Sequence, residues 1–251
     1  MKDLKDKVAV ITGGAGEIGY ATAQVLLSYG AKVLLVDLEE KALKERIKDG
    51  DTKDLDYAVA DVTDEKQVEG YFKTAEKKFG KVDIFHNNAG IEGPVAKMPD
   101  FKLEDFEKVM AVNVTGVFLG MKYAPAYMND GGSIIISSSV AGLQATPGMV
   151  GYVTSKHAVI GIMRTAALEL APRKIRVNSI HPGVIDSRMM NAIESGLGDD
   201  AAAVHKDFEE QVPLKRYGKE EEMAKLVAFL ASDMSSYTTG STYVADGGIS
   251  L

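Results

Sequence analysis

A tyrosine and a lysine stand four residues apart in GYVTSKHAVIGIMRTAALEL, a stretch with a helical pattern of apolar residues. Because side chains at i and i+4 share a helix face, the Cβ atoms of Tyr152 and Lys156 are expected to lie about 6 Å apart. A phenol with its ordinary pKa of about 10 is nearly all protonated at pH 7. A neighbouring ammonium favours the phenolate, so at this spacing the lysine can act on the surroundings of the phenol.

One Y-x-x-x-K among ten tyrosines is weak by itself, but other polar residues accompany it. Ser139 ends the apolar run SIIISSS thirteen residues before the tyrosine, and Asn113 stands in AVNVTG. NNAG occupies positions 87–90, and HPG occupies positions 181–183. Each residue also has a structural interpretation: the serine as a turn residue, the asparagine as a helix kink and the tyrosine as an aromatic at a helix N-terminus.

A glycine-rich stretch, TGGAGEIG at 12–19, follows the strand-like run KVAVI and precedes an amphipathic segment. Glycines in this context permit a sharp turn, so that a pyrophosphate can meet the N–H groups at the helix N-terminus. The stretch fits G-x-G-x-x-G when taken from Gly14. It also fits T-G-x-x-x-G-x-G from Thr12, with Glu17 where the middle glycine should stand.

Asp37 ends the next apolar run, VLLVD, eighteen residues after the glycine loop. An acid at this distance accepts hydrogen bonds from the adenosine ribose and repels a 2′-phosphate, and neither Leu38 nor Glu39 adds a positive charge. This favours NAD over NADP, although a strand-end aspartate can also be a solvated turn residue. Asp61, in ADVTD, is expected either to bind the adenine amino group or to cap the helix that starts near Asp64.

Short runs rich in Val and Ile alternate with segments of helical period. The alternation predicts one α/β domain over 1–251, with a doubly wound parallel sheet of about seven strands and helices on both faces. The half at 1–100 is expected to bind mainly the cofactor. The clearest predicted strands are 8–11, 32–36, 56–60, 82–86, 133–136 and 176–180.

Residues 187–212 break this rhythm, because they are helical in composition, contain two glycines and follow the end of a strand. Long insertions at the carboxyl ends of strands are often functional, so we expect a small substrate lid. The alternative is a surface excursion with no role in binding.

Composition excludes several other classes of function. The net charge of −7 and the pI near 5.2 argue against a nucleic-acid partner, which requires a basic surface. There are no cysteines, and the four histidines lack metal-binding spacing, so no metal site is expected. No apolar run resembles a signal peptide or a membrane span, and we expect a cytoplasmic enzyme.

The joint order and spacing of these motifs, with TGSTYVADGG near the C-terminus, resemble the short-chain dehydrogenase/reductase family along nearly the whole chain. The resemblance implies a Rossmann-type domain that transfers a hydride between NAD and a small alcohol or ketone. It favours the T-G-x-x-x-G-x-G interpretation, in which Glu17 is the departure. We expect the Glu17 side chain to point to solvent and Gly16 to absorb the unusual backbone dihedral.

The resemblance also implies a role for each site residue. Tyr152 would be the general acid/base, with Lys156 lowering its pKa and binding the nicotinamide ribose. Ser139 would donate to the substrate oxygen, Asn113 would hold a water that links the lysine to solvent, and Ser187 would bind the carboxamide from the family's usual threonine position. The other expected cofactor contacts are Gly13, Glu17, Ile18, Gly19, Asp37, Leu38, Asp61, Val62, Asn88, Ala89, Gly90, Pro182, Gly183 and Ile185.

The substrate pocket is expected to be mostly apolar, with no arginine to bind a carboxylate or phosphate. NNAGIEG, GVFLG and VPLKRYG are similar to stretches in family members that act on cyclic substrates, which favours a cyclic or otherwise apolar secondary alcohol. Methionines here can instead fill the core of the lid. Glu92 either binds a second hydroxyl of a diol or polyol or is a solvated loop residue. The expected pocket residues are Gln144, Met149, Val150, Val184, Met189 and Met190.

Two other functions stay open. A 3-oxoacyl-(acyl-carrier-protein) reductase would usually prefer NADPH, which Asp37 disfavours. A nucleotide sensor or scaffold on the same fold would not need the complete set of polar residues described above. The resemblance further implies a homotetramer in which the helical segments 113–128 and 152–170 pack against their symmetry mates.

Overall fold

The computed structural model describes residues 2–47, 53–198 and 200–251. Within these ranges seven strands form one parallel sheet with the order β3-β2-β1-β4-β5-β6-β7. The doubly wound α/β prediction is confirmed, and each predicted strand overlaps an observed one. The strands are β1 (Val8–Thr12), β2 (Lys32–Asp37), β3 (Leu55–Val59), β4 (Val82–Asn87), β5 (Met128–Ser137), β6 (Arg176–Pro182) and β7 (Thr242–Ala245).

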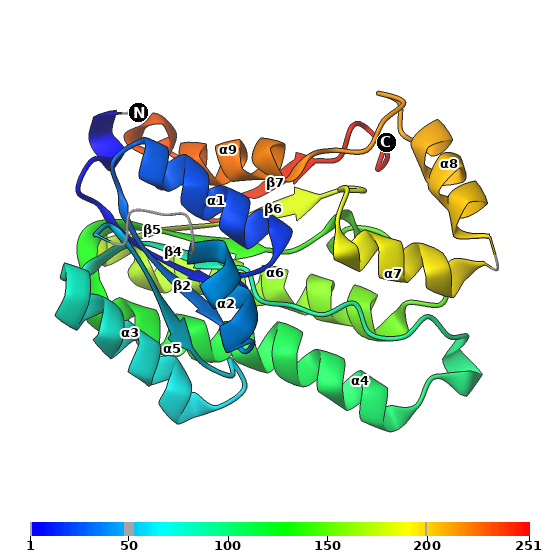
Figure 1. Ribbon diagram of the computed structural model, residues 1–251, viewed down its shortest axis with the longest axis horizontal. Coiled ribbons are helices and arrows are strands. Elements are labelled where there is room, and N and C mark those ends of the chain that lie inside the picture. The colour runs from blue at the N-terminus through cyan, green and yellow to red at the C-terminus, as the bar shows by residue number, and fades with distance from the viewer. Residues whose placement is uncertain (1, 48–52, 199) are drawn as a thin grey trace.

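Helices cover both faces of the sheet, with α1, α2 and α9 on one side and α3, α5 and α6 on the other (Figure 1). In the described part of the chain, no helix has the length and apolar character needed to cross a membrane. The helices are α1 (Glu17–Ser28), α2 (Glu40–Ile47), α3 (Glu65–Phe79), α4 (Leu103–Met110), α5 (Val117–Tyr127), α6 (Val150–Leu170), α7 (Arg188–Leu197), α8 (Ala201–Gln211) and α9 (Glu220–Ala231).

Each central strand contributes to two hydrophobic cores at once. Val8 and Val10 of β1 pack with the core under α3, α5 and α6, whereas Ala9 and Ile11 pack with the core under α1, α2 and α9. Successive strand residues point to opposite faces, so a strand covered on both faces is expected to be apolar at most positions, as in β1 and β2. This explains why the sequence shows unbroken apolar runs without polar alternation.

The sheet reverses its direction of winding between β1 and β4, which are neighbours in the sheet. The chain leaves β1 toward β2 on one side and leaves β4 toward β5 on the other. In open α/β sheets this switch point creates a crevice at the carboxyl ends of the strands, where ligands bind. The glycine loop follows β1 and NNAG ends β4, so both lie at this crevice.

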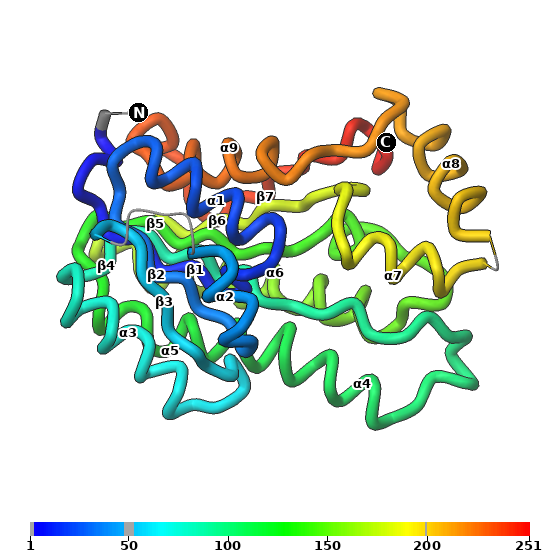
Figure 2. Tube along the Cα trace, in the orientation of Figure 1, coloured from blue at the N-terminus to red at the C-terminus, as the bar shows by residue number. Residues whose placement is uncertain are grey.

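Residues 187–212 form α7 and α8, which lie at the end of the molecule far from the N-terminus (Figure 2). Ser187 caps α7 by accepting a hydrogen bond from the Met190 N–H at 3.2 Å. Asp200 caps α8 by accepting from two backbone N–H groups at 3.1 Å. Both helices thus begin with a hydrogen-bonding cap, as helix N-termini require. The lid function of this segment stays a prediction.

Candidate active site

The glycine loop turns at its first glycine. Gly13 has a φ of +64°, a conformation that favours glycine, and Gly16 has an extended φ of −70° as the residue that precedes α1. The expectation that Gly16 absorbs the unusual dihedral is therefore wrong. Gly19 is required for a different reason, because a Cβ there would lie 2.2 Å from the Gly13 carbonyl oxygen. The loop and the first turn of α1 can approach so closely only without that side chain.

Glu17 is the first residue of α1, so it has ordinary helical geometry and needs no glycine. We expected the Glu17 side chain to point to solvent, but the structure shows it partly buried. The Glu17 carboxylate accepts a hydrogen bond from the Arg188 backbone N–H at 3.2 Å. This N–H belongs to the first turn of α7, where the helix dipole favours an anion. The contact joins the glycine loop to the predicted lid.

The end of β1 is tied to the turn that follows β4. The Thr12 hydroxyl oxygen accepts hydrogen bonds from the backbone N–H groups of Asn88 at 2.9 Å and Ala89 at 3.1 Å. The Asn88 side-chain amide in turn donates to the Thr12 carbonyl at 3.0 Å and to the Gly13 carbonyl at 3.4 Å. The two segments expected to contact the cofactor are thus one hydrogen-bonded unit.

Asp37 lies against the glycine loop rather than in open solvent. One of its carboxylate oxygens accepts from the Ala15 N–H at 3.0 Å, and the other accepts from the Leu38 N–H at 2.8 Å. The Leu38 side chain beside it is largely exposed. The carboxylate therefore lies next to the loop, where it can accept ribose hydroxyls.

Asp61 does not cap the following helix, because Asp64 does so by accepting from two backbone N–H groups of α3. The Asp61 carboxylate instead accepts from the N–H and the hydroxyl of Thr63 at 2.8 and 2.7 Å. Val62 packs close to Gly116, where an added Cβ would lie 2.9 Å from the valine side chain. The helix-cap alternative for Asp61 is therefore wrong, and its contact with adenine stays a prediction.

Tyr152 and Lys156 lie on the same face of α6, as predicted, with the ammonium nitrogen 5.4 Å from the centre of the phenol ring. Both side chains are buried, and the Lys156 Nζ donates to the Ser137 carbonyl at 3.0 Å. Burial raises the pKa of Tyr152 to about 12, although hydrogen bonding to Ser139 partly opposes this. Burial also lowers the pKa of Lys156 to about 8. Removal from water disfavours the charged form of each group.

Ser139 lies beside this pair at the end of β5. Its hydroxyl oxygen accepts from the Ala141 N–H at 3.1 Å, and hydrogen bonding to this serine lowers the pKa of the Tyr152 phenol. The Ser139 carbonyl lies 2.9 Å from the Nδ1 of His181 in β6. Because a carbonyl can only accept, the Nδ1 carries the proton and holds the serine backbone in place.

Asn113 lies in a short π-helical segment, Ala111–Gly116, between α4 and α5. Its side chain is buried and exchanges two hydrogen bonds of 2.8 Å with the Ile91 backbone. It also donates to the Ser155 hydroxyl at 3.0 Å. Because these contacts use both amide hydrogens, the side chain has no hydrogen left to donate to the predicted water. The water itself stays a prediction.

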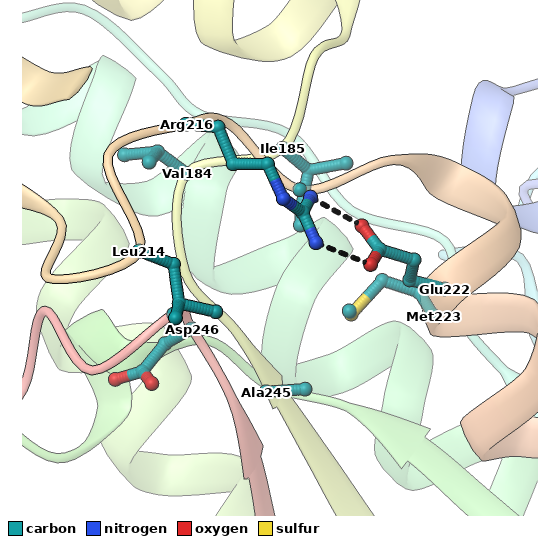
Figure 3. A pocket seen from close by; sticks show the side chains of 10 residues that line it. Val184, Ile185, Leu214, Arg216, Glu222, Met223, Ala245 and Asp246 are labelled. Carbon is teal, nitrogen blue, oxygen red and sulfur yellow. Dashed lines mark hydrogen bonds and ion pairs between the residues drawn. The ribbon is translucent and has the colours of Figure 1, made fainter.

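The segment from Pro182 to Ser187 is held from behind by the C-terminal part of the chain. Gly183 donates its N–H to the Ala245 carbonyl at 3.1 Å, and an added Cβ at this glycine would lie 2.7 Å from Asp246. A cavity of about 190 Å³ adjoins Val184 and Ile185. Figure 3 shows that Arg216 and Glu222 pair at this cavity, at 2.7 and 2.8 Å, and that the Asp246 carboxylate also lies there. The charges of Arg216 and Glu222 thus neutralise each other.

The expected substrate residues are mostly brought together. The side chains of Met149, Val184 and Met190 form one buried cluster with Tyr152. Met189 packs against this cluster, with its sulfur 3.9 Å from the tyrosine hydroxyl. Gln144 lies exposed outside the cluster, and Val150 is half-buried in the first turn of α6. An apolar environment therefore surrounds the tyrosine on the side of α7.

The sequence did not predict two contacts near the site. Arg188, the residue after Ser187, pairs with Glu92 through contacts of 2.8 and 3.3 Å. Because Glu92 neutralises this guanidinium, the expectation of a pocket with no arginine to bind a carboxylate or phosphate stays a prediction. Glu194 of α7 is buried and accepts from the Tyr217 hydroxyl at 2.6 Å, which fastens α7 to the loop before α9. Neither partner is near in sequence, so no local pattern indicated these contacts.

Comparisons with known proteins agree with this geometry. A family model described as enoyl-(acyl carrier protein) reductase matches residues 13–250. The chain is 37% identical over 250 residues to levodione reductase of Leifsonia aquatica, covering 97% of this chain and 94% of that protein. It is 38% identical over 250 residues to a 3-oxoacyl-(acyl-carrier-protein) reductase of Thermotoga maritima, covering 98% of each.

Among solved structures, an NAD⁺-bound xylitol dehydrogenase matches with a TM-score of 0.93 and 35% identity, covering 98% of this chain and 99% of that one. The likeness thus covers nearly the full length of this chain and of each of these relatives. The chain therefore belongs to the short-chain dehydrogenase/reductase family of oxidoreductases.

Proposed function

We propose that the protein is an NAD(H)-dependent dehydrogenase that interconverts a cyclic or otherwise apolar secondary alcohol with its ketone. The observation that carries this proposal is the buried pair of Tyr152 and Lys156 beside the predicted cofactor crevice. A Cβ added at Gly90, in the turn after β4, would lie 3.4 Å from the Lys156 Nζ. The lysine can therefore reach both the phenol and the residues expected to bind the cofactor.

The described residues fit a dinucleotide. The N-terminus of α1 offers N–H groups to a pyrophosphate, and Gly13 and Gly19 leave the approach free of side chains. Asp37 holds its carboxylate beside this loop, where a ribose can donate to it. When bound, oxidised NAD would supply the hydride acceptor and a positively charged ring that favours the phenolate.

The proton chemistry follows from the two buried side chains. In oxidation the Tyr152 phenolate would accept the hydroxyl proton of the alcohol, and in reduction the phenol would return it to the ketone oxygen. Lowering the pKa of this phenol from about 12 to near 7 requires about 7 kcal/mol of preferential phenolate stabilisation. Lys156 contributes to it, because with a pKa of about 8 it is still mostly protonated at pH 7. Ser139 would hold the substrate oxygen beside the phenol.

The preference for NAD is supported by the position of Asp37. A carboxylate beside the glycine loop can accept hydrogen bonds from the two hydroxyls of a ribose, but it repels a 2′-phosphate. The similar xylitol dehydrogenase is described with NAD⁺ bound, which agrees with this preference.

An apolar substrate is supported by the cluster of Met149, Val184 and Met190 around the tyrosine, and by the likeness to levodione reductase. A diol or polyol is the second candidate, because the paired Glu92 and Arg188 bring polar groups to the same region. The negative charge of Glu92 raises the pKa of Tyr152, so the carboxylate lies close enough to act on the phenol. The 38% identical reductase of T. maritima makes 3-oxoacyl thioesters a third class to assay.

Replacement of the catalytic phenol tests the proposed function. We expect Tyr152→Phe to lower kcat by at least about 10²-fold, since it removes the proton-exchanging hydroxyl, while the Kd for NADH changes by less than about twofold. Steady-state kinetics and NADH fluorescence measure the two quantities. Tyr71→Phe, in a buried tyrosine of α3, is the matched control and should keep normal turnover. A Tyr152→Phe enzyme with more than a tenth of the normal kcat would exclude this phenol as the acid/base.

The buried ammonium is expected to destabilise the folded protein. The pKa of Lys156 is about 8 in the folded state and 10.5 in the unfolded chain, so folding disfavours the proton. Below pH 8 both states are charged and the full penalty, about 3 kcal/mol, applies. Between pH 8 and 10.5 the unfolded chain binds more protons, so this penalty disappears as the pH rises.

We therefore expect Lys156→Met to raise the free energy of unfolding at pH 7 by about 2 kcal/mol, allowing for the lost bond to the Ser137 carbonyl. The gain over the natural protein should shrink between pH 8 and 10.5, as measured by urea denaturation. Lys225→Met, in an exposed lysine of α9, should show neither effect. A gain that is constant with pH would contradict the buried-charge explanation.

We also propose a homotetramer, as implied by the family resemblance. Exposed apolar residues on the two helices expected at the interfaces support it, with Phe118 of α5 50% exposed and Leu168 of α6 80% exposed. Light scattering should report about four times the 26.9 kDa chain mass. Leu168→Glu should lower this mass, whereas Leu103→Glu on α4 should not. A monomer at micromolar concentration would contradict the proposal.

A further inference from the structure

His86, near the end of β4, is a completely buried histidine that lies outside the catalytic set. Its Nε2 is 2.9 Å from the Ser137 hydroxyl, at the end of the neighbouring strand β5. The Ser137 hydroxyl donates to the Asn88 side-chain oxygen at 2.9 Å. A chain of buried hydrogen bonds thus runs from the imidazole to the asparagine that contacts the glycine loop.

The direction of every bond in this chain can be derived. The Asn88 amide nitrogen faces the carbonyl oxygens of Thr12 and Gly13, which can only accept, so its side-chain oxygen must face Ser137. The single hydroxyl hydrogen of Ser137 is then committed to that oxygen. The Ser137 oxygen must therefore accept from His86, so the imidazole carries its proton on Nε2.

This arrangement leaves the other ring nitrogen of His86 unprotonated. The Nδ1 is buried and has no hydrogen-bond partner among the residues that the structure describes. Burial lowers the pKa of this imidazole to about 3, so it stays neutral in the physiological range. A buried acceptor without a partner destabilises a fold, and an apolar side chain of similar size would avoid that penalty. Packing alone therefore does not favour an imidazole at this position, whereas an imidazole can donate its Nε2–H to the Ser137 oxygen.

The far end of the chain is the point where the glycine loop turns. Gly13 has its positive φ there, and its carbonyl accepts both from Asn88 and from the Gly16 N–H that closes the turn. The orientation of the Asn88 amide thus fixes the two peptide planes on either side of Gly13. If the Ser137 hydroxyl rotated away, the Asn88 side-chain oxygen would lose the hydrogen bond that it accepts from Ser137.

We propose that His86 is a positioning residue for the cofactor: its Nε2–H orients Ser137, Ser137 orients Asn88, and Asn88 holds the Thr12 and Gly13 carbonyls so that the loop is preorganised for a pyrophosphate. The proposal rests on the proposed dinucleotide binding at this loop. It assigns no chemical step to the imidazole, which acts through the other two side chains.

Three substitutions separate positioning from packing. Gln at position 86 places an amide N–H near the place of Nε2, whereas Asn is too short to reach Ser137 and Leu has no donor. We expect His86→Leu and His86→Asn to raise the Kd for NADH at least about fivefold, with kcat at saturating cofactor within about twofold of normal. His86→Gln should keep the Kd within about twofold. The melting temperature of His86→Leu should not fall, because the unpaired Nδ1 is removed.

Two further measurements keep the test independent of cofactor binding. Nitrogen NMR of the free protein should show His86 protonated on Nε2 and bare on Nδ1 at neutral pH. Amide exchange of residues 12–16 should be faster in His86→Leu and His86→Asn than in the natural protein or His86→Gln. Ser137→Ala, which removes the middle of the chain, should show the same faster exchange and add nothing when combined with His86→Leu.

The proposal is overturned if loop exchange is the same in all variants, if His86 carries its proton on Nδ1, or if His86→Asn and His86→Gln behave alike. If the natural protein binds NADH but His86→Leu binds it equally well, the positioning role also fails while the proposed function stands. If the natural protein binds no NADH, the proposed function fails, and loop exchange still decides whether the imidazole preorganises the loop.

Discussion

The site depends on one constraint: the parallel strands of the described residues end at the same edge of one sheet, so residues far apart in the sequence meet there. Thr12, Asn88 and Ser137 end or follow three neighbouring strands and are joined by hydrogen bonds. The two cores hold the central strands in register, because each central strand packs on both of its faces. A shift of any strand by one residue would exchange its core faces and displace its polar terminus from the site.

Burial then determines the chemistry of the residues that meet at this edge. The phenol of Tyr152 and the amine of Lys156 are both removed from water, which disfavours the phenolate and the ammonium at once. The free protein thus holds the Tyr152 phenol, the proposed acid/base, in the protonated form, and the phenolate would depend on positive charges placed near it. The same low-dielectric surroundings that oppose ionisation make those charges more effective.

The sequence predicts the sheet well because strands buried on both faces are mostly apolar, and it places Asp37, Asn88 and Ser139 correctly at or just after strand ends. The helix period likewise predicts that Tyr152 and Lys156 share a face. Prediction from the sequence fails where the local backbone conformation is decisive, as with the positive φ at Gly13 instead of Gly16. It also fails where a contact joins distant residues, as between Glu17 and the Arg188 backbone. Such contacts join residues up to 171 positions apart, beyond the reach of any local pattern.

The most direct test of the account is nicotinamide absorbance during turnover, with NAD⁺ and NADP⁺ run in parallel against cyclic alcohols, linear secondary alcohols, vicinal diols and polyols. The account predicts turnover with NAD⁺, at least tenfold weaker turnover with NADP⁺ because of Asp37, and the highest kcat/KM with a cyclic alcohol. Equal turnover with both cofactors, or a preference for NADP⁺, would contradict the role given to the carboxylate beside the glycine loop.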